Sequence, residues 1–313
     1  MSIEEVGQLS SRVIDEVERA IVGKREALEL VLLGILGDGH VLLEDYPGLA
    51  KTLIARSFAQ ATALAFSRIQ FTPDLMPSDV TGSSIYNQQT NEFEFRPGPI
   101  FANILLGDEI NRAPPKTQAA LLEAMQERQV TIEGTTRQLE RPFLVLATQN
   151  PIEYEGTYPL PEAQLDRFTM RLDIGYPPPD QEARMLSEQT SDPPLDQLEP
   201  VTNATGITEV IDEATRIFVE PSLNRYVVDL VGQTRSDQRL YLGASPRAGI
   251  SLLRVSKARA LADGRDYVLP DDVQAVATAV LAHRLILGPE ARANGTPAQQ
   301  LVSETVERTP VPA

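Results

Sequence analysis

The sequence predicts an α/β fold with a parallel sheet, followed by a smaller all-α domain. In the first part of the chain, short runs that are apolar on both faces alternate with segments of helical periodicity, as in a parallel sheet covered by helices. The predicted strands are 40–43, 66–70, 103–109, 143–149 and 169–174. After Asp173 the pattern changes, because residues 176–200 are rich in proline and charge and every later periodic segment is helical.

Helical periodicity then fixes the remaining elements. The predicted helices are 3–20, 24–36, 51–63 and 116–128 in the first part, and 207–218, 222–233, 246–262 and 270–287 in the second. The tail after Gly288 is expected to be poorly ordered in part. The predicted organisation is an α/β domain at 1–190, a linker at 191–203 and a helical domain at 204–313.

Composition excludes several kinds of site. The 313 residues are enough for two domains, and 42% hydrophobic residues are enough for sizeable cores. The chain has no cysteine, so a disulfide framework is excluded. The two histidines, His40 and His283, are too few and too far apart for a zinc site, and His40 is interpreted as structural.

Charge and hydropathy bear on partners and location. The formal net charge is −16, whereas proteins that bind nucleic acid usually carry a basic face, so no nucleic-acid partner is expected. No apolar run approaches the length of a membrane span, and residues 1–20 are acidic and amphipathic, unlike a signal peptide. We therefore expect a soluble, cytoplasmic protein without a membrane span.

Residues 40–59, HVLLEDYPGLAKTLIARSFA, combine a strand, a Pro-Gly turn and a helix. Such a loop binds phosphate when backbone N–H groups and a helix N-terminus face the anion. A lysine then reaches the β- and γ-phosphates, and a Ser or Thr hydroxyl holds Mg²⁺. Lys51 and Thr52 stand in these positions. The predicted ATP-binding residues are Asp45, Tyr46, Pro47, Gly48, Leu49, Ala50, Lys51 and Thr52.

The loop departs from the pattern GxxxxGK[ST] at both glycines. Asp45 and Ala50 occupy these two positions. Alanine is a small change, and aspartate tolerates a left-handed backbone better than most residues, although its carboxylate would lie near the phosphates. Taken alone, the segment could also be a strand–turn–helix with a chance Lys-Thr pair.

Polar residues end two further predicted strands. Asp108 and Glu109 follow the run ILLG, where Asp108 can hold Mg²⁺ together with Thr52 and Glu109 can orient and deprotonate the attacking water. Asn150 follows FLVLATQ and can bond the γ-phosphate or that water. The alternatives are a solvated strand end for the acids and a cap or turn residue for Asn150.

Five stretches carry a family resemblance. In order and spacing they resemble the AAA+ superfamily and, within it, the MoxR family, over about residues 20–290. The stretches are HVLLEDYPGLAKT, FTPDLMPSDVTG, GDEINRAPPKTQAALLEAMQERQVT, LATQNPIEYEGTYPLPEAQLDRF and GASPRA. The resemblance implies an αβα P-loop ATPase core with a helical lid, usually working as a hexameric ring with ATP between core, lid and neighbouring subunit.

The resemblance also implies residue roles. It makes Lys51 and Thr52 the Walker A residues, Asp108 and Glu109 the Walker B residues, and Asn150 sensor 1. Ile21, Val22 and Gly23 match the loop that borders the adenine.

Two arginines complete the implied roles. Arg167 matches the arginine finger that reaches into the next subunit's site, and Arg247 matches sensor 2, which closing of the lid would aim at the nucleotide. Without the resemblance, Arg167 could be a surface ion pair and Arg247 an ordinary helix-start residue. The role of Arg112, beside the Walker B acids, is left open.

Two insertions are implied as well. Residues 72–99 match the insert in the second core helix, and within them 93–97 alternate like a strand. Residues 129–140 match the hairpin before sensor 1, with two alternating strands around Gly134. In this clade such elements face the pore or top of the ring and often contact the client; a passive edge ribbon is the alternative for the hairpin.

The leading interpretation is a molecular motor in chaperone-like work, which remodels or activates a client protein. By resemblance alone, a partner with a von Willebrand factor A domain is expected. The AAA+ subunit of a metal chelatase and a Rubisco-activating relative share the same core and insertions. A DNA-dependent motor is disfavoured by the charge of −16. A scaffold that binds nucleotide without hydrolysis is disfavoured by the presence of Glu109 and Arg167.

Overall fold

A computed structural model describes residues 1–45, 50–150, 157–176, 178–187 and 194–312 of the chain. Within these ranges, five strands form one parallel sheet in the order β2-β5-β8-β1-β9. The strands are β1 (Val41–Glu44), β2 (Phe66–Gln70), β5 (Ile104–Asp108), β8 (Leu144–Gln149) and β9 (Met170–Leu172). The predicted parallel α/β sheet is confirmed.

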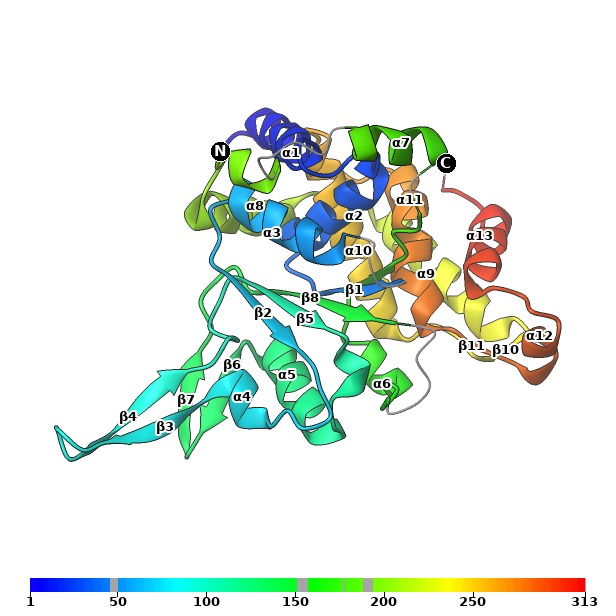
Figure 1. Ribbon diagram of the computed structural model, residues 1–313. Coiled ribbons are helices and arrows are strands. Elements are labelled where there is room, and N and C mark those ends of the chain that lie inside the picture. The colour runs from blue at the N-terminus through cyan, green and yellow to red at the C-terminus, as the bar shows by residue number, and fades with distance from the viewer. Residues whose placement is uncertain (46–49, 151–156, 177, 188–193, 313) are drawn as a thin grey trace.

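Helices cover both faces of this sheet (Figure 1). One face carries α1 (Ile3–Glu18), α2 (Arg25–Leu36) and α3 (Lys51–Ala61), and the other carries α4 (Pro77–Thr81) and α5 (Pro115–Glu127). Alternate residues of the strands enter two separate hydrophobic clusters: Val41 and Leu43 join the first, and Leu42 joins the second. This is why the strands read as continuous apolar runs.

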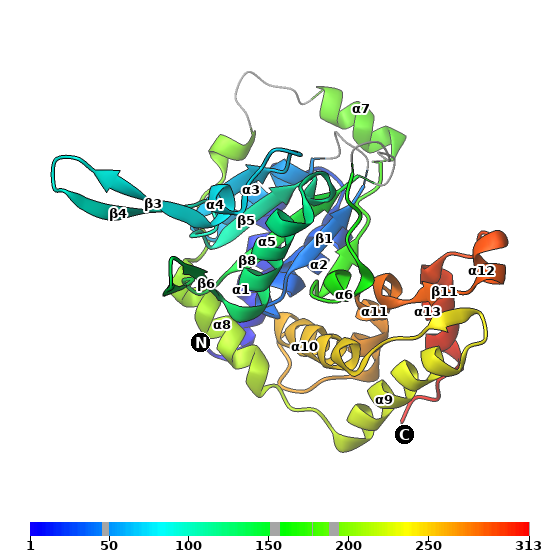
Figure 2. The same ribbon diagram turned by 90° about the horizontal axis from the view of Figure 1, so that it is seen from below.

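Two hairpins project from the body of the molecule on one side (Figures 1 and 2). They are β3 (Gly82–Asn87) with β4 (Glu92–Pro97), and β6 (Gln129–Ile132) with β7 (Thr135–Gln138). The hairpin around Gly134 agrees with its prediction, but residues 72–99 hold more regular structure than the single strand expected there. Strand β3, within residues 72–99, is mostly polar and does not pack against a hydrophobic core. Its sequence therefore shows no alternation of apolar and polar residues.

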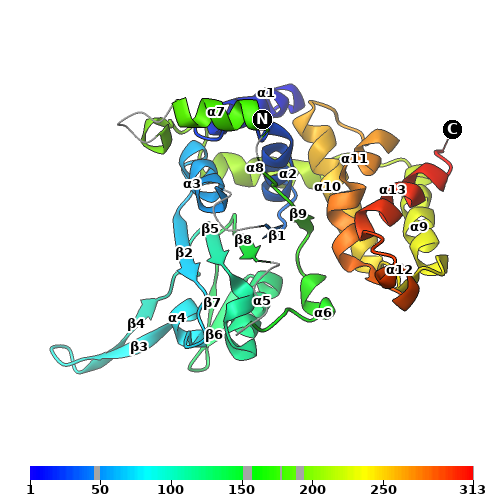
Figure 3. The same cartoon turned by 45° about the vertical axis from the view of Figure 1, so that its right-hand side comes forward.

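Helix α6 (Glu162–Leu165) precedes β9, and after β9 the chain is mainly helical. The helices and short strands after β9 are α7 (Pro179–Ser187), α8 (Ala204–Arg216), α9 (Pro221–Ser236), β10 (Leu240–Leu242), α10 (Pro246–Ala262), α11 (Pro270–Leu281), β11 (Ile286–Leu287), α12 (Pro289–Ala293) and α13 (Ala298–Arg308). Three short 3₁₀ helices cover Ile110–Arg112, Pro194–Gln197 and Ala282–Arg284. Figure 3 shows α9 and α11–α13 gathered beside the sheet, with α6 between them and α5.

Two expectations for the second part are wrong. The helix predicted to run to residue 287 ends at Leu281, because the following residues turn to pair β11 with β10. The tail after Gly288 is helical, since α13 buries Leu301 and Val302 against the neighbouring helices. Strands of two or three residues are too short to produce a periodic signal.

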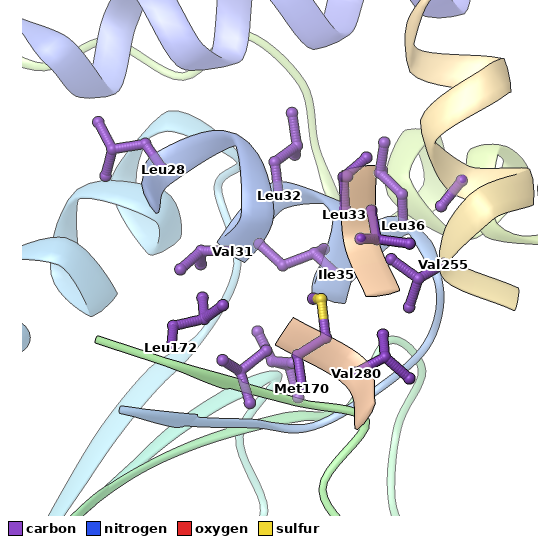
Figure 4. Packing of buried hydrophobic residues seen from close by; sticks show 14 of the residues in the cluster. Leu28, Val31, Leu32, Leu33, Ile35, Leu36, Met170, Leu172, Val255 and Val280 are labelled. Carbon is purple, nitrogen blue, oxygen red and sulfur yellow. The ribbon is translucent and has the colours of Figure 1, made fainter. Parts of the chain in front are cut away.

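Helix α2 joins the sheet to the second part of the chain (Figure 4). Val31 and Ile35 lie over Met170 and Leu172 of β9, while Leu36 faces Val255 of α10. Because these residues belong to one continuous cluster, the sheet and the helices beyond it share a hydrophobic core. In the part of the chain that the structure describes, no helix is both long and apolar enough to cross a membrane.

Candidate nucleotide site

The carboxyl ends of the five parallel strands meet at one edge of the sheet, here called the carboxyl edge. Asp45 follows β1, Asp108 ends β5 and Asn150 follows β8. In open parallel sheets, ligands bind beside this edge. Since β8 lies between β5 and β1, Asn150 stands between the acids and the phosphate-binding segment. Asn150 is buried at this position.

The predicted phosphate loop begins and ends as a nucleotide loop requires. Tyr46, Pro47, Gly48 and Leu49 lie outside the described residues. Ala50 adopts a left-handed backbone with φ of 54°, a conformation that glycine takes more readily, and α3 starts directly after it with Lys51 and Thr52. The helix N-terminus, with its free N–H groups, therefore faces the carboxyl edge.

Lys51 is buried beside three acids. Its Nζ donates a 2.6 Å hydrogen bond to the backbone oxygen of Asp45. Burial lowers the pKa of the Lys51 ammonium, and the charges of Asp45, Asp108 and Glu109 act in the opposite direction. A cation so enclosed is suited to an anionic ligand that can match its charge.

Asp45, at the first glycine position of the pattern, has a structural partner. Its Oδ2 accepts a 2.6 Å hydrogen bond from the backbone N–H of Gly175, beyond β9. The carboxylate is thus bound to the neighbouring turn. This contact answers the concern that the side chain would lie free among phosphate oxygens.

Asp108 is held by two neighbouring strands. Its Oδ1 accepts from the hydroxyl of Thr148 on β8 at 2.6 Å, and its Oδ2 accepts from Arg68 on β2 at 2.6 Å. The Thr148 hydroxyl also accepts a 2.8 Å hydrogen bond from the backbone N–H of Glu109. One threonine therefore orients both acids.

Glu109 takes an unusual backbone conformation with φ of 56°, and its side chain is fixed by two donors. Its Oε2 accepts from Gln70 Nε2 and from Arg112 Nη1, each at 2.9 Å. The role that the sequence left open for Arg112 is thus a contact with the predicted base. Sequence reasoning missed Gln70, although it ends a strand just as Asp108 does. Thr148 was hidden inside an apolar run.

The loop expected at the adenine is tied to the same edge. Lys24, which follows Val22 and Gly23 in the sequence, donates from Nζ to the backbone oxygens of Ile174, Gly175 and Tyr176 at 2.9–3.0 Å. Gly23 lines a cavity of about 630 Å³ between this turn and helices α11 and α13. That volume lies within the usual range for small-molecule sites.

The two predicted catalytic arginines lie at the opposite, amino edge of the sheet. Arg167 comes shortly before β9, where the N–H of Thr169 donates to the backbone oxygen of His40 at the start of β1. Arg247 Nη1 lies 3.9 Å from Oδ2 of Asp166. The structure therefore places Arg247 beside Asp166, the residue before Arg167, and separates this edge from Lys51 by the full length of β1, roughly 13 Å for four residues.

Comparisons with known proteins agree with this architecture. The sequence profile of the ATPase family associated with various cellular activities (AAA) matches residues 40–170, and that of the AAA lid domain matches 232–305. Protein YeaC of Bacillus subtilis is 49% identical over 99% of this chain and 97% of its own length. Chaperone MoxR1 of Mycobacterium tuberculosis is 45% identical over 96% of this chain and 82% of its own.

The chain belongs to the MoxR family of AAA+ ATPases. A crystal structure of a putative ATPase from Cytophaga hutchinsonii is similar throughout, with a TM-score of 0.91, 43% identity, and coverage of 99% of this chain and 96% of that one. The α/β AAA+ core and the helical lid of the MoxR family are therefore both present.

The donor set of this MoxR-family site is compatible with Mg²⁺. The ion prefers oxygen ligands and is usually bound by one or two carboxylates together with phosphates and water. Thr52 and Asp108 supply a hydroxyl and a carboxylate at the carboxyl edge. No cluster of three or more acids, histidines or cysteines suited to a metal occurs in the described ranges.

Proposed function

We propose that this MoxR-family protein binds ATP with Mg²⁺ at the carboxyl edge, hydrolyses it, and uses the turnover to remodel or activate a client protein. The observation that carries the proposal is the Glu109 carboxylate, which Gln70 and Arg112 hold beside Asp108 and the buried Lys51. The chaperone-like role follows the name of the relative Chaperone MoxR1.

The residues at this edge have complementary tasks. Lys51 and the start of α3 bind the β- and γ-phosphates, while Thr52 and Asp108 hold Mg²⁺, which neutralises charge on the phosphates when bound. Glu109 orients the attacking water and accepts its proton. Asn150 contacts the γ-phosphate or the water, and Val22 and Gly23 border the base.

The arginines are proposed to act between subunits of a ring, for which a hexamer is expected. Arg167 and Arg247 lie at the amino edge, across the sheet from Lys51 of the same chain. A neighbouring copy whose carboxyl edge faces this amino edge would bring its nucleotide within reach of both guanidinium groups. There they would stabilise the negative charge that develops during phosphoryl transfer.

The hydrolysis proposal is tested with the purified protein by phosphate release in Mg²⁺, in excess EDTA, and in Mg²⁺ with duplex DNA. Turnover in Mg²⁺ that EDTA abolishes and DNA leaves unchanged is expected. Tight ATP binding with no turnover would favour the scaffold alternative, and strong stimulation by DNA would favour a DNA-dependent motor.

The client surface is proposed to include both hairpins. Phe93 and Tyr86 on β3–β4 are 73% and 48% exposed, and their rings lie tilted to each other with 5.3 Å between centroids. The hairpin that carries them projects far out from the core (Figure 2). Arg137 of β7 lies 3.9 Å over the ring of Phe95, which links the second hairpin to the first. Exposed aromatic pairs of this kind favour protein contacts.

Substitutions on the second hairpin test this surface. Thr135→Ala or Thr136→Ala should leave basal ATPase activity near normal and reduce the activity that a client stimulates, because both side chains are exposed and lie away from the nucleotide site. Ser303→Ala, an exposed hydroxyl on α13 at the far side of the molecule from the hairpins (Figure 1), serves as the control. Equal loss of basal and stimulated turnover would support a passive ribbon. The von Willebrand factor A partner and the cytoplasmic location stay predictions.

A further inference from the structure

One lid arginine, Arg284, donates hydrogen bonds to the turn that carries Arg167 as well as to its own lid, where it binds the backbone oxygen of Val280 and, at 3.4 Å, the hydroxyl of Ser251. Arg284 follows α11, and its side chain is only 2% exposed. Its Nε donates to Asp166 Oδ1 at 2.6 Å, and its Nη2 and Nη1 donate to the backbone oxygens of Phe168 at 2.7 Å and Thr169 at 3.1 Å. These acceptors stand on both sides of Arg167 in the sequence.

The same turn is bound by the start of α10. The second oxygen of Asp166, Oδ2, lies 3.4 Å from the hydroxyl of Ser245 and 3.9 Å from Arg247 Nη1. Ser245 caps α10 by accepting from the N–H of Ala248, so the contact reaches a rigid helix end. Asp166 thus joins two separate lid segments, one through Arg284 and one through Arg247.

These contacts connect the turn that carries Arg167, here called the finger turn, to the lid in addition to the sheet, in whose core cluster Phe168 is fully buried. The hydrogen bond from Thr169 to His40 joins the turn to the start of β1. The planar guanidinium of Arg284 binds two side chains, Asp166 and Ser251, and several backbone oxygens at once, a geometry that a lysine ammonium cannot reproduce. A buried, multiply bonded arginine holds its acceptors in one arrangement.

We propose that Arg284 and Asp166 are positioning residues that fasten each subunit's arginine finger to its own lid. When the lid of one subunit moves, Arg167 and Arg247 then move together relative to the neighbour's nucleotide. The inference rests on the proposed function, in which Arg167 acts across the interface. It adds a mechanical route by which the lid of one subunit controls hydrolysis in the next.

A second lid ion pair provides a matched control. Arg265 binds Asp272 through two hydrogen bonds of 2.6 and 2.8 Å, and Asp272 is almost completely buried. This pair lies beyond the C-terminal end of α10, whereas Arg247 lies at its N-terminal end, about 25 Å away for a 17-residue helix. It resembles the Arg284–Asp166 pair in chemistry but does not touch the finger turn.

The test compares Arg284→Lys with Arg265→Lys in the full-length protein. Both variants should bind ATP with near wild-type affinity. Arg284→Lys should hydrolyse it about 10²-fold more slowly, as expected for a catalytic group displaced by about 1 Å. Arg265→Lys should retain its rate. If Arg284→Lys does not fold, as judged by thermal unfolding, Asp166→Asn takes its place, because Asp166 is less buried.

Mixing two subunit variants then distinguishes a displaced arginine finger from general damage to the subunit. Subunits with Arg284→Lys keep an intact Glu109, and subunits with Glu109→Gln supply an intact finger, so activity should return when the two exchange into common rings. A parallel mixture of Arg167→Ala with Glu109→Gln reports on the proposed function. Rescue of Arg167→Ala without rescue of Arg284→Lys, or a wild-type rate for Arg284→Lys alone, would overturn the inference. Absence of rescue in both mixtures, with exchange demonstrated, would overturn the proposed function instead.

Discussion

The two edges of the sheet are organised in different ways. At the carboxyl edge, Asp108 and Glu109 receive hydrogen bonds from Arg68, Gln70, Arg112 and Thr148, all within the core. At the amino edge, the turn with Arg167 is held by side chains from the lid. The first edge is therefore organised by the core itself, while the second is held by the lid as well as by the core.

This difference has a consequence for catalysis. The residues proposed to bind nucleotide and activate water lie at one edge, and the cations proposed to stabilise the transition state lie at the other. Under the proposed function, neither edge contains the complete set, and efficient hydrolysis would require two copies of the chain to meet. Changes at the two edges should accordingly have different signatures in binding, in rate and in mixed assemblies.

The largest effect at the carboxyl edge is expected for Glu109→Gln. The amide keeps the shape and the contact with Arg112 but cannot accept a proton, so hydrolysis should fall by about 10²–10⁴-fold while ATP binding is retained. Phosphate release and nucleotide titration measure the two properties. Glu123→Gln, on the exposed face of α5, is the matched control. Turnover of Glu109→Gln at the wild-type rate would exclude this residue as the base.

A smaller effect, on affinity, is expected for Lys51→Ala. The variant removes a charge-assisted hydrogen bond to phosphate, which corresponds to a loss of about 10- to 100-fold in ATP affinity. Titration with a fluorescent ATP analogue measures it, with the exposed Lys116→Ala as control. Unchanged affinity would mean that the nucleotide does not bind on the segment before α3.

The third effect, on stability and not on rate or affinity, concerns the amino edge. His40 precedes β1, where Nε2 bonds the backbone oxygen of Met125 and Nδ1 accepts from the N–H of Val145. Burial, the first cause, and the nearby Arg128 lower the pKa of His40 from 6.5 to about 3. Below about pH 6.5 the His40 side chain is therefore protonated in the unfolded chain, whereas in the folded protein it stays neutral until the pH approaches 3. The contribution of the neutral His40 to stability is present above about pH 6.5 and is lost as the pH falls toward 3.

Measurement of unfolding free energy against pH tests this assignment. The contribution of His40 should approach about 1.4 kcal/mol for each pH unit between 6.5 and 3. His40→Gln should reduce the slope by that amount, even if it lowers stability at pH 7. An unchanged slope would contradict a neutral, buried His40.

The sequence was informative where local pattern decides structure. Asp108 and Asn150 end apolar strands, and the parallel arrangement alone brings such ends together, so the carboxyl edge could be predicted residue by residue. Gln70 obeys the same rule and could have been found with it. Thr148 could not, because a threonine inside an apolar run resembles any β-branched strand residue.

The amino edge was less accessible to sequence reasoning. Arg167 and Arg247 were found only through resemblance, and the turn that carries Arg167 is bound by Arg284, about 120 residues further along the chain. Arg284 carried one signal, since it is a charged residue within the apolar run AVLAHRLIL and a buried charge requires a partner. Nothing in the sequence pointed to Asp166 as that partner.

The most direct test of the division between the edges is a mixture of two inactive variants. Arg167→Ala should bind ATP almost normally yet hydrolyse it poorly, since an arginine finger contributes roughly 10³–10⁵ in rate. Mixed with Glu109→Gln, it should regain activity, because some interfaces pair an intact Glu109 with a neighbour's intact Arg167, and the rescue should fade on dilution below the assembly concentration. If labelling demonstrates subunit exchange and no activity returns, Arg167 does not act across an interface, and the proposed sharing of catalysis between the two edges is wrong.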